Sequence, residues 1–354
     1  MAVMPMMKAI VKTSGGKYRL EDVEIPRPGP GEVLVKVAAS AENPADWKNM
    51  TMVPEGHIIG YDFAGTVHEI GPCLDSEREL RYVGERVAGL VHGGAARNGA
   101  FAEFVVAQAG LLFHLPDNIS FEEGAQMGVA CMTACYSLYL SLDLPTPYDT
   151  ETVPQTTLLV WSGSTSVGQI VMQLAKLSNM RVIATASPKQ FDFVRSLGAD
   201  EVYDYSDSFT GREIFQATGG NIHCAVDCWS EGMSPYQVSA SLSNDHGKIA
   251  SLLPYQSRKK GIESTFVFAY AIFGKDTVFP FPSKADTVAA QKAREFAQLT
   301  SRLLAEGKIR LGPIKVFPDG LAGVADGMEY ARMGKVHGEK IVHRITDTPG
   351  LRAK

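Results

Sequence analysis

Cysteine is scarce in this sequence. The 354 residues include five cysteines, an odd and low number that argues against a disulfide-stabilised fold. Two pairs, Cys131/Cys135 and Cys224/Cys228, are each separated by four positions, whereas paired metal ligands more often follow the C-x-x-C spacing. Small buried side chains are therefore a better interpretation of these thiols than zinc ligands, and we expect no bound metal.

Positive charge and long apolar runs are also lacking. Lys and Arg number 34 against 39 Asp and Glu, a formal net charge of −5, which disfavours a nucleic-acid-binding surface. The densest basic run, residues 258–260, is better explained as a solvated loop. No stretch approaches the ~20 apolar residues that span a membrane, and the N-terminal residues show no signal-peptide pattern. We expect a cytoplasmic protein that binds neither membranes nor nucleic acids.

A strand, a turn of small residues and a helix organise the second half of the chain. Thr157–Trp161 is apolar and β-branched, which predicts a buried parallel strand. Ser162 to Ser166 form a turn, and apolar residues at helical spacing follow. Arg181–Ala186 then predicts a second strand. A βαβ unit of this kind binds a dinucleotide pyrophosphate where its first turn meets the helix N-terminus.

That turn lacks the middle glycine of the G-x-G-x-x-G pattern. Gly163 and Gly168 are present, but Thr165 stands between them, so the pattern by itself is weak. A purely structural βα loop remains the alternative on these residues alone.

The chain is long enough for two domains. Residues 1–150 contain short strands separated by Gly and Pro turns, which predicts a small β barrel, and residues 121–142 predict two helices separated at Gly128. Residues 143–155 are proline-containing and polar, and indicate a domain boundary. Beyond them, five strands alternate with helices, which predicts a doubly wound parallel sheet. A long amphipathic helix over residues 286–306 and a short strand at 340–343 follow.

Several motifs together resemble one superfamily. Pro-Gly-Pro-Gly-Glu-Val at 28–33, Asn-Pro-x-Asp at 43–46, Gly-x-Asp-x-x-Gly at 60–65 and Gly-Glu-Arg-Val at 84–87 precede the βαβ unit. This pattern resembles the medium-chain dehydrogenase/reductase superfamily over nearly the whole chain. The resemblance implies an α/β protein with a GroES-like β-barrel domain, residues 1–150 completed by 286–354, and a Rossmann domain, residues 151–285.

The zinc enzymes of that superfamily carry a metal-binding Cys and Gly-His-Glu where this sequence has Asn43 and Gly60-Tyr61-Asp62. The zinc-free quinone oxidoreductases and enoyl reductases therefore match better. Residues 43–48, 162–168, 186–189 and 266–274 more narrowly resemble the fungal trans-acting enoyl reductases, which serve iterative polyketide synthases of the lovastatin type. Thr165 is normal in that family.

The resemblance and the βαβ pattern together predict NADPH as the cofactor. Ser187 and Lys189 follow the second strand, with no acidic residue before Asp192; a hydroxyl and a cation suit a 2′-phosphate. For Lys189 the alternative is an exposed lysine at the start of a helix. For Tyr205 it is core or surface packing. Leu252 and Leu253 could simply belong to a buried strand. The residues expected to contact the cofactor are Ala45, Asp46, Trp47, Lys48, Ser164, Thr165, Ser166, Val167, Ser187, Pro188, Lys189, Gln190, Tyr205, Leu252, Leu253, Ile341 and Val342.

Lys48 is the candidate catalytic residue, oriented by Asn43 or Asp46, although a salt-bridged surface lysine is an equal interpretation. The expected reaction is hydride delivery to the β-carbon of an unsaturated thioester. Two segments of small and apolar residues should form the substrate wall, with core packing as the alternative. They comprise Gly128, Val129, Ala130, Cys131, Met132, Thr133, Ala134 and Cys135, and Ala269, Tyr270, Ala271, Ile272 and Phe273.

The resemblance implies a polyketide synthase as partner, which would present the substrate on its acyl carrier domain, and a monomeric protein. Two alternatives remain on sequence grounds: a stand-alone NADPH quinone or enone reductase of the same fold, and a non-catalytic binding protein that keeps the fold.

Overall fold

The computed structural model describes residues 5–72, 81–149 and 156–351. Cys73 and part of the predicted boundary segment, residues 150–155, lie outside these ranges. The chain divides into two compact units: unit 1 is Met1–Val129, Tyr270–Gly307 and Leu311–Lys354, and unit 2 is Ala130–Ala269 with Lys308–Arg310. Both main boundaries fall earlier in the chain than positions 150 and 285, where the sequence placed them.

Packing explains the earlier boundaries. The helical turn Tyr136–Ser141 packs against strand β12 (Gly247–Ser251), so it belongs to unit 2. From Tyr270 to Gly307 the chain packs into unit 1, where Tyr270 stacks on Tyr61 and Phe279 joins the main apolar cluster. The boundary therefore follows side-chain burial, whereas residues 143–149, the described part of the predicted boundary segment, have exposed or half-buried side chains.

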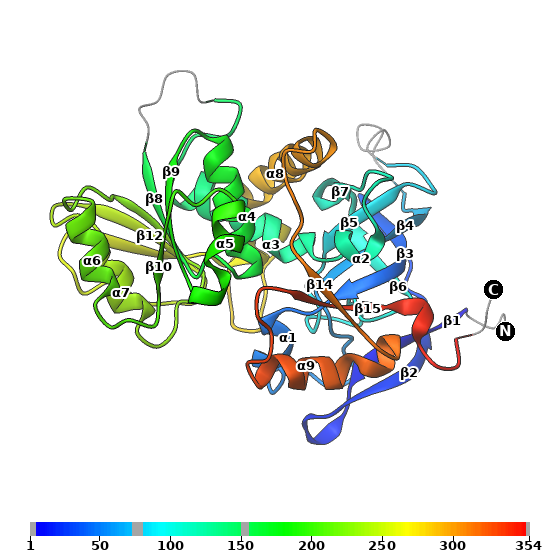
Figure 1. The fold of residues 1–354 in the computed structure, drawn as a ribbon. Helices are drawn as coiled ribbons and strands as arrows, with labels where there is room; N and C mark the ends of the chain where they lie inside the picture. Colours follow the sequence, from blue (N-terminus) through cyan, green and yellow to red (C-terminus); the bar gives the residue numbers. More distant parts are fainter. Residues whose placement is uncertain (1–4, 73–80, 150–155, 352–354) are drawn as a thin grey trace. The chain divides into compact units, whose positions relative to one another are not determined.

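Unit 1 contains the predicted β-rich domain, completed by the C-terminal segment (Figure 1). One sheet has the order β14-β15-β3-β4-β5-β7, with β6 also pairing with β3, and β1 and β2 form a hairpin. The strands are β1 Met6–Lys12, β2 Tyr18–Glu24, β3 Glu32–Ala41, β4 Asp62–Ile70, β5 Arg86–Leu90, β6 Phe104–Gln108, β7 Phe113–His114, β14 Ile314–Phe317 and β15 Lys340–Arg344.

Strand β3 connects the two ends of the chain. It pairs with β6 through Glu32–Lys36, while its last residues, Ala39 to Ala41, pair with β15 of the C-terminal segment. Register shifts at Leu34/Val35 and Val37/Ala39 interrupt its pairing with β4, and such bulges let a strand bend and twist. The bend allows β3 to pair with β6 at one end and with β15 at the other.

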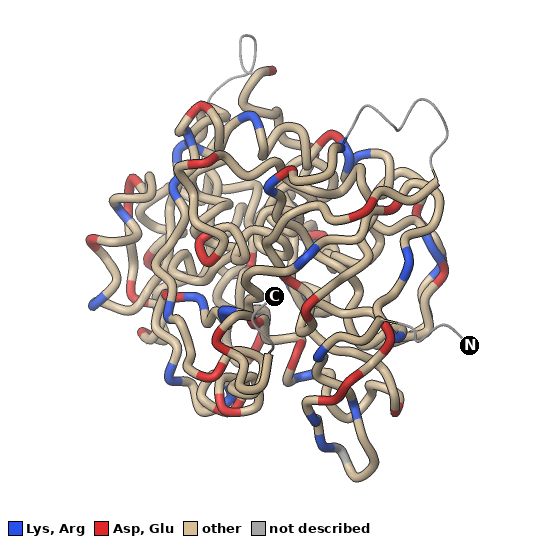
Figure 2. The backbone as a smooth tube through the Cα atoms, turned by 90° about the vertical axis from the view of Figure 1, so that its right-hand side faces the viewer, with Lys and Arg blue, Asp and Glu red and all other residues tan. Residues whose placement is uncertain are grey.

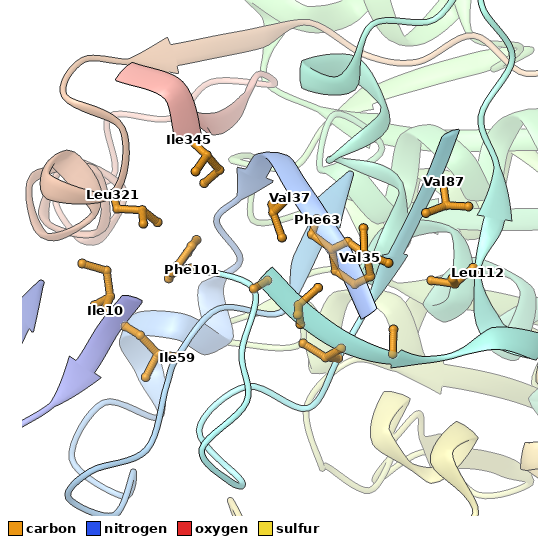
Figure 3. Close-up of a cluster of buried hydrophobic side chains, with 14 of the residues drawn as sticks. Ile10, Val35, Val37, Ile59, Phe63, Val87, Phe101, Leu112, Leu321 and Ile345 are labelled. Carbon is orange, nitrogen blue, oxygen red and sulfur yellow. The ribbon is translucent and has the colours of Figure 1, made fainter. Parts of the chain in front are cut away.

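The core of unit 1 is built from both ends of the chain. Val35, Val37 and Phe63 of the early strands share an apolar cluster with Leu321 and Ile345 of the C-terminal segment (Figure 3). Burying apolar surface contributes about 25 cal/mol per Å². The C-terminal segment is therefore part of this core, as the resemblance implied.

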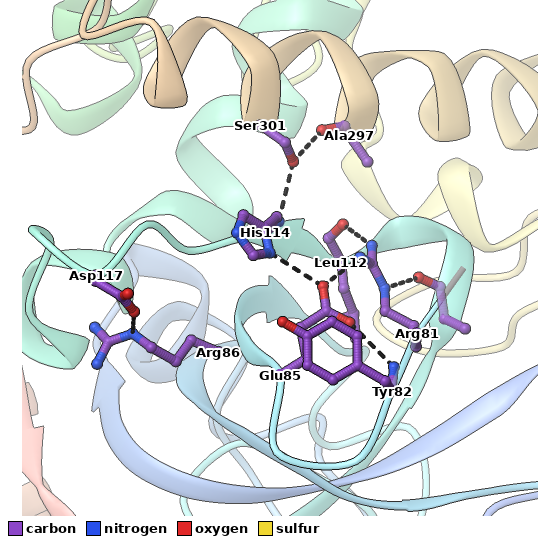
Figure 4. A network of polar contacts seen from close by, with 10 residues as sticks. Arg81, Tyr82, Glu85, Arg86, Leu112, His114, Asp117, Ala297 and Ser301 are labelled. Carbon is purple, nitrogen blue, oxygen red and sulfur yellow. Dashed lines mark hydrogen bonds and ion pairs between the residues drawn. The ribbon is translucent and has the colours of Figure 1, made fainter. Parts of the chain in front are cut away.

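A polar network fixes helix α8 (Thr287–Ala305) to the same unit (Figure 4). The backbone N–H of His114 donates to Ser301 Oγ at 3.0 Å, and the His114 ring contacts Glu85. Arg81 also bonds Glu85 and the carbonyl of Ala109. Asp286 caps α8 by accepting the N–H of Ala289. The predicted helix over 286–306 thus agrees with the structure to within one residue at each end.

Unit 2 is the predicted doubly wound sheet. Its six parallel strands have the order β10-β9-β8-β11-β12-β13, the 3-2-1-4-5-6 arrangement in which ligands bind at the carboxyl ends near the reversal between β8 and β11. The elements are β8 Thr157–Trp161, α4 Ser166–Leu177, β9 Arg181–Ala186, α5 Phe191–Ser196, β10 Glu201–Asp204, α6 Thr210–Ala217, β11 Cys224–Asp227, α7 Ser234–Ser241, β12 and β13 Ile262–Phe266.

Two sequence predictions need correction. Strand β13 was not predicted, because its Ile-Glu-Ser-Thr-Phe sequence has a weak apolar pattern. Gly128 does not separate two helices: it lies inside α3 (Met127–Cys135), and the break follows α2 (Phe121–Gly124). A Cβ at Gly128 would come within 2.3 Å of Asp62 Oδ1, so glycine is required there for close approach.

No helix in the described part of the chain combines the length and apolar character needed to cross a bilayer. Over the backbone tube, Lys and Arg are interspersed with Asp and Glu (Figure 2). This mixed pattern agrees with the small negative net charge.

Candidate active site

In unit 1, the polar residues of the site begin where β3 ends. Asn43 precedes the five-residue helix α1 (Pro44–Lys48), and its backbone N–H donates to Asp46 Oδ2 at 2.7 Å. A carboxylate three residues into a helix that bonds back to the cap is half of a capping box. This bond directs Asp46 into the interior, where it is 2% exposed, and leaves Trp47 and Lys48 half-buried. Lys48 Nζ lies 5.5 Å from the centroid of the Trp47 ring.

A buried cation lies at the centre of this cluster. Lys340 Nζ of β15 donates to Asn43 Oδ1 at 2.6 Å and lies 3.4 Å from Asp62 Oδ2. Asn43 Nδ2 donates to the same Asp62 oxygen at 2.9 Å, and the Val129 N–H donates to the other at 2.7 Å. Burial raises the pKa of Asp62, while Lys340 and these donors act in the opposite direction. Lys340 and Asn43 at Oδ2 and the Val129 N–H at Oδ1 leave no oxygen of Asp62 unpaired.

These residues do not fit zinc. The resemblance pairs Asn43, Tyr61 and Asp62 with the Cys and Gly-His-Glu of zinc enzymes. These three side chains are an amide, a phenol and a carboxylate, whereas zinc sites use thiolate, imidazole and carboxylate ligands. The ammonium group of Lys340 also contacts Asn43 and Asp62 and would repel a divalent cation. Within the described ranges, no three His, Cys, Asp or Glu residues are placed to hold a metal ion.

Three aromatic rings pack beside this cluster in unit 1. The Tyr270 ring stacks on His92 with centroids 4.1 Å apart and on Tyr61 with centroids 5.3 Å apart. The Tyr270 hydroxyl is hydrogen-bonded to the Tyr61 hydroxyl, and Asn49 Nδ2 lies 3.5 Å from Tyr61. Burial lowers the pKa of His92 to about 4, so its ring is neutral. The sequence analysis placed Tyr270 in a substrate wall but identified neither Tyr61 nor His92.

A second buried acid pairs with histidine. Glu42 Oε1 and His343 Nε2 are 2.6 Å apart and both side chains are buried. Burial raises the pKa of Glu42 to about 9 and lowers that of His343 to about 4. Both shifts favour the neutral forms, so Glu42 holds the proton and donates it to the imidazole. This pair joins the end of β3 to β15.

In unit 2, the turn after β8 leads directly into helix α4. Thr165 caps α4 by accepting the N–H of Gly168 at 3.2 Å, and its hydroxyl donates to the Ser162 carbonyl at 2.8 Å. A Cβ at Gly168 would lie 2.7 Å from that carbonyl, so glycine is needed for the close approach of turn and helix. The N–H groups of Ser166 and Val167 begin the helix and point toward an incoming anion.

Neighbouring strand ends bring the predicted cofactor residues Ser187 to Gln190 and Tyr205 to the same edge of the unit 2 sheet. Ser187 to Gln190 directly follow β9, which pairs with β8. The Tyr205 N–H, just after β10, donates to the Ala186 carbonyl at 3.3 Å, and the Tyr205 side chain is exposed. Lys189 is exposed, and none of the ion pairs found among the described residues includes it. The segment contains no acidic side chain.

The sequence analysis missed Asp227, which organises the ends of β11 and β12. Its Oδ1 accepts the N–H groups of Trp229 and Ser230, and its Oδ2 accepts the hydroxyls of Ser234 and Tyr255. The Ser230 hydroxyl in turn accepts the Leu252 N–H at 2.9 Å. An acidic residue ending an otherwise apolar strand was the available signal. Leu252 and Leu253 lie just beyond β12, which ends at Ser251 rather than including them.

The remaining predicted residues differ in exposure. Ile341 and Val342 are buried within β15, and residues 128–135 are buried except Val129. Within that segment the Thr133 hydroxyl oxygen is buried without a hydrogen-bond partner. Ala269–Phe273 forms a 3-10 helix that buries Ile272 and leaves the other side chains half-exposed.

Comparisons with known proteins agree with this architecture. The family model described as Alcohol dehydrogenase GroES-like domain matches residues 29–117, and that described as Zinc-binding dehydrogenase matches residues 166–256. A trans-enoyl reductase of Petromyces alliaceus is 33% identical over 345 residues, 95% of this chain and 96% of its own. Another, of Aspergillus sclerotiorum, is 36% identical over 362 residues, with 96% and 100% covered.

Among solved structures, an alcohol dehydrogenase superfamily protein from Novosphingobium aromaticivorans has a similar fold. Its TM-score is 0.76 at 24% sequence identity, and the match covers 96% of this chain and 99% of that one. At this identity the similarity establishes the fold only.

Proposed function

This chain belongs to the trans-enoyl reductases of the medium-chain dehydrogenase/reductase superfamily, and we propose that it is an NADPH-dependent enoyl reductase. It reduces α,β-unsaturated thioesters carried by a separate polyketide synthase.

The cofactor proposal is supported chiefly by the edge of the unit 2 sheet. Thr165 and Gly168 form a turn that offers helix N–H groups to a pyrophosphate. The next strand is followed by Ser187 and an exposed Lys189, with no carboxylate there to bond an unphosphorylated ribose. A cation and a hydroxyl at this point favour a 2′-phosphate. When bound, the dihydronicotinamide supplies a hydride.

Lys340 supports a zinc-free mechanism. Its ammonium group bonds Asn43 and lies beside Asp62, so a fixed protein cation already neutralises the carboxylate. The same contacts fix Asn43, which precedes α1 and whose backbone N–H donates to Asp46. We infer that this network positions Lys48, the catalytic residue, to contact the substrate or the nicotinamide ribose.

Ala269–Phe273 and residues 128–135 form the substrate wall in this proposal. The half-exposed side chains of the first segment and the unpartnered Thr133 hydroxyl of the second suit a chain that is mainly apolar but carries a polar thioester. The substrate arrives on an acyl carrier domain of the synthase, and the protein acts as a cytoplasmic monomer.

The test is a paired assay of the purified protein. A simple enoyl thioester and a quinone are each mixed with NADPH, and absorbance at the reduced-cofactor band is followed. The proposal expects turnover of the thioester with NADPH and far weaker turnover with NADH. Turnover of the quinone alone would instead identify a stand-alone quinone reductase, and binding of neither cofactor would indicate a non-catalytic protein.

A further inference from the structure

Strand β11 of unit 2 ends in a loop with a strained backbone. Asp227 is the last residue of the strand, and Cys228, Trp229 and Ser230 follow it. Ser230 has a φ of 60°, in the left-handed region that residues other than glycine rarely adopt. Such conformations persist only where surrounding contacts enforce them, and they are concentrated at functional sites. The contacts that enforce this one therefore indicate what the loop does.

Asp227 is the residue that holds the loop. Its side chain is fully buried, and its Oδ1 accepts the N–H of Ser230 at 2.8 Å and that of Trp229 at 3.1 Å. The Ser230 hydroxyl donates back to the Asp227 carbonyl at 2.8 Å. The other carboxylate oxygen, Oδ2, accepts the hydroxyls of Ser234 and Tyr255. Each oxygen accepts two hydrogen bonds, so the carboxylate has little freedom to move.

The loop is bonded to both neighbouring strands of the sheet. Toward β8, the Cys228 N–H donates to the Trp161 carbonyl at 3.1 Å, directly before the turn that leads into α4. Toward β12, the Leu252 N–H donates to Ser230 Oγ at 2.9 Å and lies 3.3 Å from the Asp227 carbonyl oxygen. Strand β11 lies between β8 and β12 in the sheet order. The loop therefore connects the pyrophosphate turn of the proposed function with the segment that begins at Leu252.

A sheet with this strand order binds the two halves of a dinucleotide over its own two halves. In the proposed function, Lys189 after β9 holds the 2′-phosphate of the adenosine, so the nicotinamide half belongs to the side of β11 and β12. Leu252 follows β12 and is the expected cofactor contact there. Because the Asp227 loop is bonded on each side, it fixes the spacing between this contact and the pyrophosphate turn.

We propose that Asp227 and Ser230 are positioning residues for the nicotinamide half of the cofactor. Asp227 fixes Ser230 in its left-handed conformation, and the Ser230 hydroxyl fixes the backbone of Leu252. Neither residue needs to touch the cofactor, because both act through Leu252. This inference rests on the proposed function and names the residues that determine where the hydride donor lies.

The test compares the binding of NADPH with that of 2′-phospho-ADP-ribose, which lacks only the nicotinamide. Ser230→Ala removes the hydroxyl that accepts the Leu252 N–H and keeps the Cβ. It should raise the dissociation constant of NADPH about fivefold, the effect of one hydrogen bond, and leave that of 2′-phospho-ADP-ribose unchanged. The fluorescence of bound NADPH, which reports the surroundings of the nicotinamide, should shift as well. With an enoyl thioester, kcat should fall about 10-fold or more, because small displacements of reacting groups are costly.

Ser239→Ala is the matched control. Ser239 is 6% exposed, as is Ser230, and its hydroxyl bonds the Pro235 carbonyl and the Ser257 hydroxyl in the same unit. Both alanine variants should lose a comparable free energy of unfolding in urea. Only Ser230→Ala should change the ratio of the two ligand affinities, since a purely structural serine leaves that ratio unchanged.

A pair of substitutions tests Asp227 itself. Asparagine keeps an oxygen for the two N–H groups, and its amide can donate to the hydroxyls of Ser234 and Tyr255. Asp227→Asn should therefore bind both ligands like the wild type. Asp227→Ala leaves four donors without their acceptor and should weaken NADPH more than 2′-phospho-ADP-ribose. If Asp227→Ala does not fold, the comparison of Ser230→Ala with Ser239→Ala decides.

The outcomes separate this inference from the proposed function. If Ser230→Ala weakens both ligands equally, or weakens neither, the inference is overturned while the proposed function stands. If the wild type binds no NADPH, the proposed function fails, and the inference with it.

Discussion

Lys340 Nζ lies 2.6 Å from Asn43 Oδ1, although 297 positions separate the two residues. The bond connects the returning C-terminal strand to the loop that carries Asp46 and Lys48. It also brings a positive charge to Asp62, which is fully buried. One side chain from the end of the chain thus completes the polar cluster of the first domain.

Replacing Lys340 by methionine should destabilise the protein by about 3–5 kcal/mol, because removing one partner of a buried pair leaves an uncompensated charge. Urea unfolding monitored by tryptophan fluorescence measures this loss. Lys340→Met combined with Asp62→Asn should recover part of it, since the unpaired carboxylate is then gone. A single variant as stable as wild type would show that Lys340 does not neutralise Asp62.

Thr165 can be tested as a helix cap. Thr165→Val keeps the shape of the side chain but removes the oxygen that accepts the Gly168 N–H, so unfolding free energy should fall by about 1 kcal/mol. NADPH affinity should also weaken, because in our proposal the same turn holds the pyrophosphate. Thr165→Ser keeps the hydroxyl and is the matched control. Equal effects of the two substitutions would argue against capping by this hydroxyl.

Lys189→Ala should weaken NADPH binding by about 10-fold or more, the value of a charge-assisted hydrogen bond, and leave NADH binding nearly unchanged. Fluorescence titration with each cofactor measures the two dissociation constants. Lys260→Ala, an exposed lysine of the same unit, serves as the control. An equal loss for both cofactors would contradict contact with the 2′-phosphate.

The Glu42–His343 pair predicts how stability depends on pH. In the folded protein the pair keeps one proton from about pH 4 to about pH 9, whereas in the unfolded chain Glu42 and His343 titrate near 4.3 and 6.5. Between those two values both states hold one proton, so the pair adds no pH dependence. From about pH 6.5 to 9 only the folded state is protonated, and stability should fall with rising pH by at most about 1.4 kcal/mol per unit.

Urea unfolding at pH 6 and pH 8.5 tests that decline. Glu42→Gln cannot ionise and should flatten the alkaline part of the profile, while Glu295→Gln, on the exposed side of α8, should keep it. An unchanged slope in Glu42→Gln would show that another group is responsible.

Local sequence was sufficient for much of the fold. Strands β8 and β9 begin and end at the predicted residues, because buried parallel strands are continuous apolar runs between clear turns. The short strand β13 lacks such a run and was missed. Gly128 was misjudged because its small size serves an approach to Asp62, and that contact is not visible in local sequence.

Residues of the candidate site could be located from the sequence only where they directly follow a recognisable strand. The turn from Ser162 to Gly168 and the Ser187–Lys189 pair follow strands and could be located from them. Lys340, Asp227 and the stack of Tyr61, His92 and Tyr270 depend on contacts between distant segments. Asp227 carries a local signal, an acid at the end of an apolar strand. Nothing in the local sequence sets the other residues apart, so only the folded chain brings them together.

The central proposal is hydride transfer to the β-carbon of an enoyl thioester. The most direct test uses NADPH carrying deuterium at the transferring position of its nicotinamide, with an enoyl thioester on an isolated acyl carrier domain. We predict a saturated thioester with one deuterium at the β-carbon, detected by mass spectrometry and NMR. A saturated product without that deuterium, or no saturated product while a quinone is reduced under the same conditions, would contradict it.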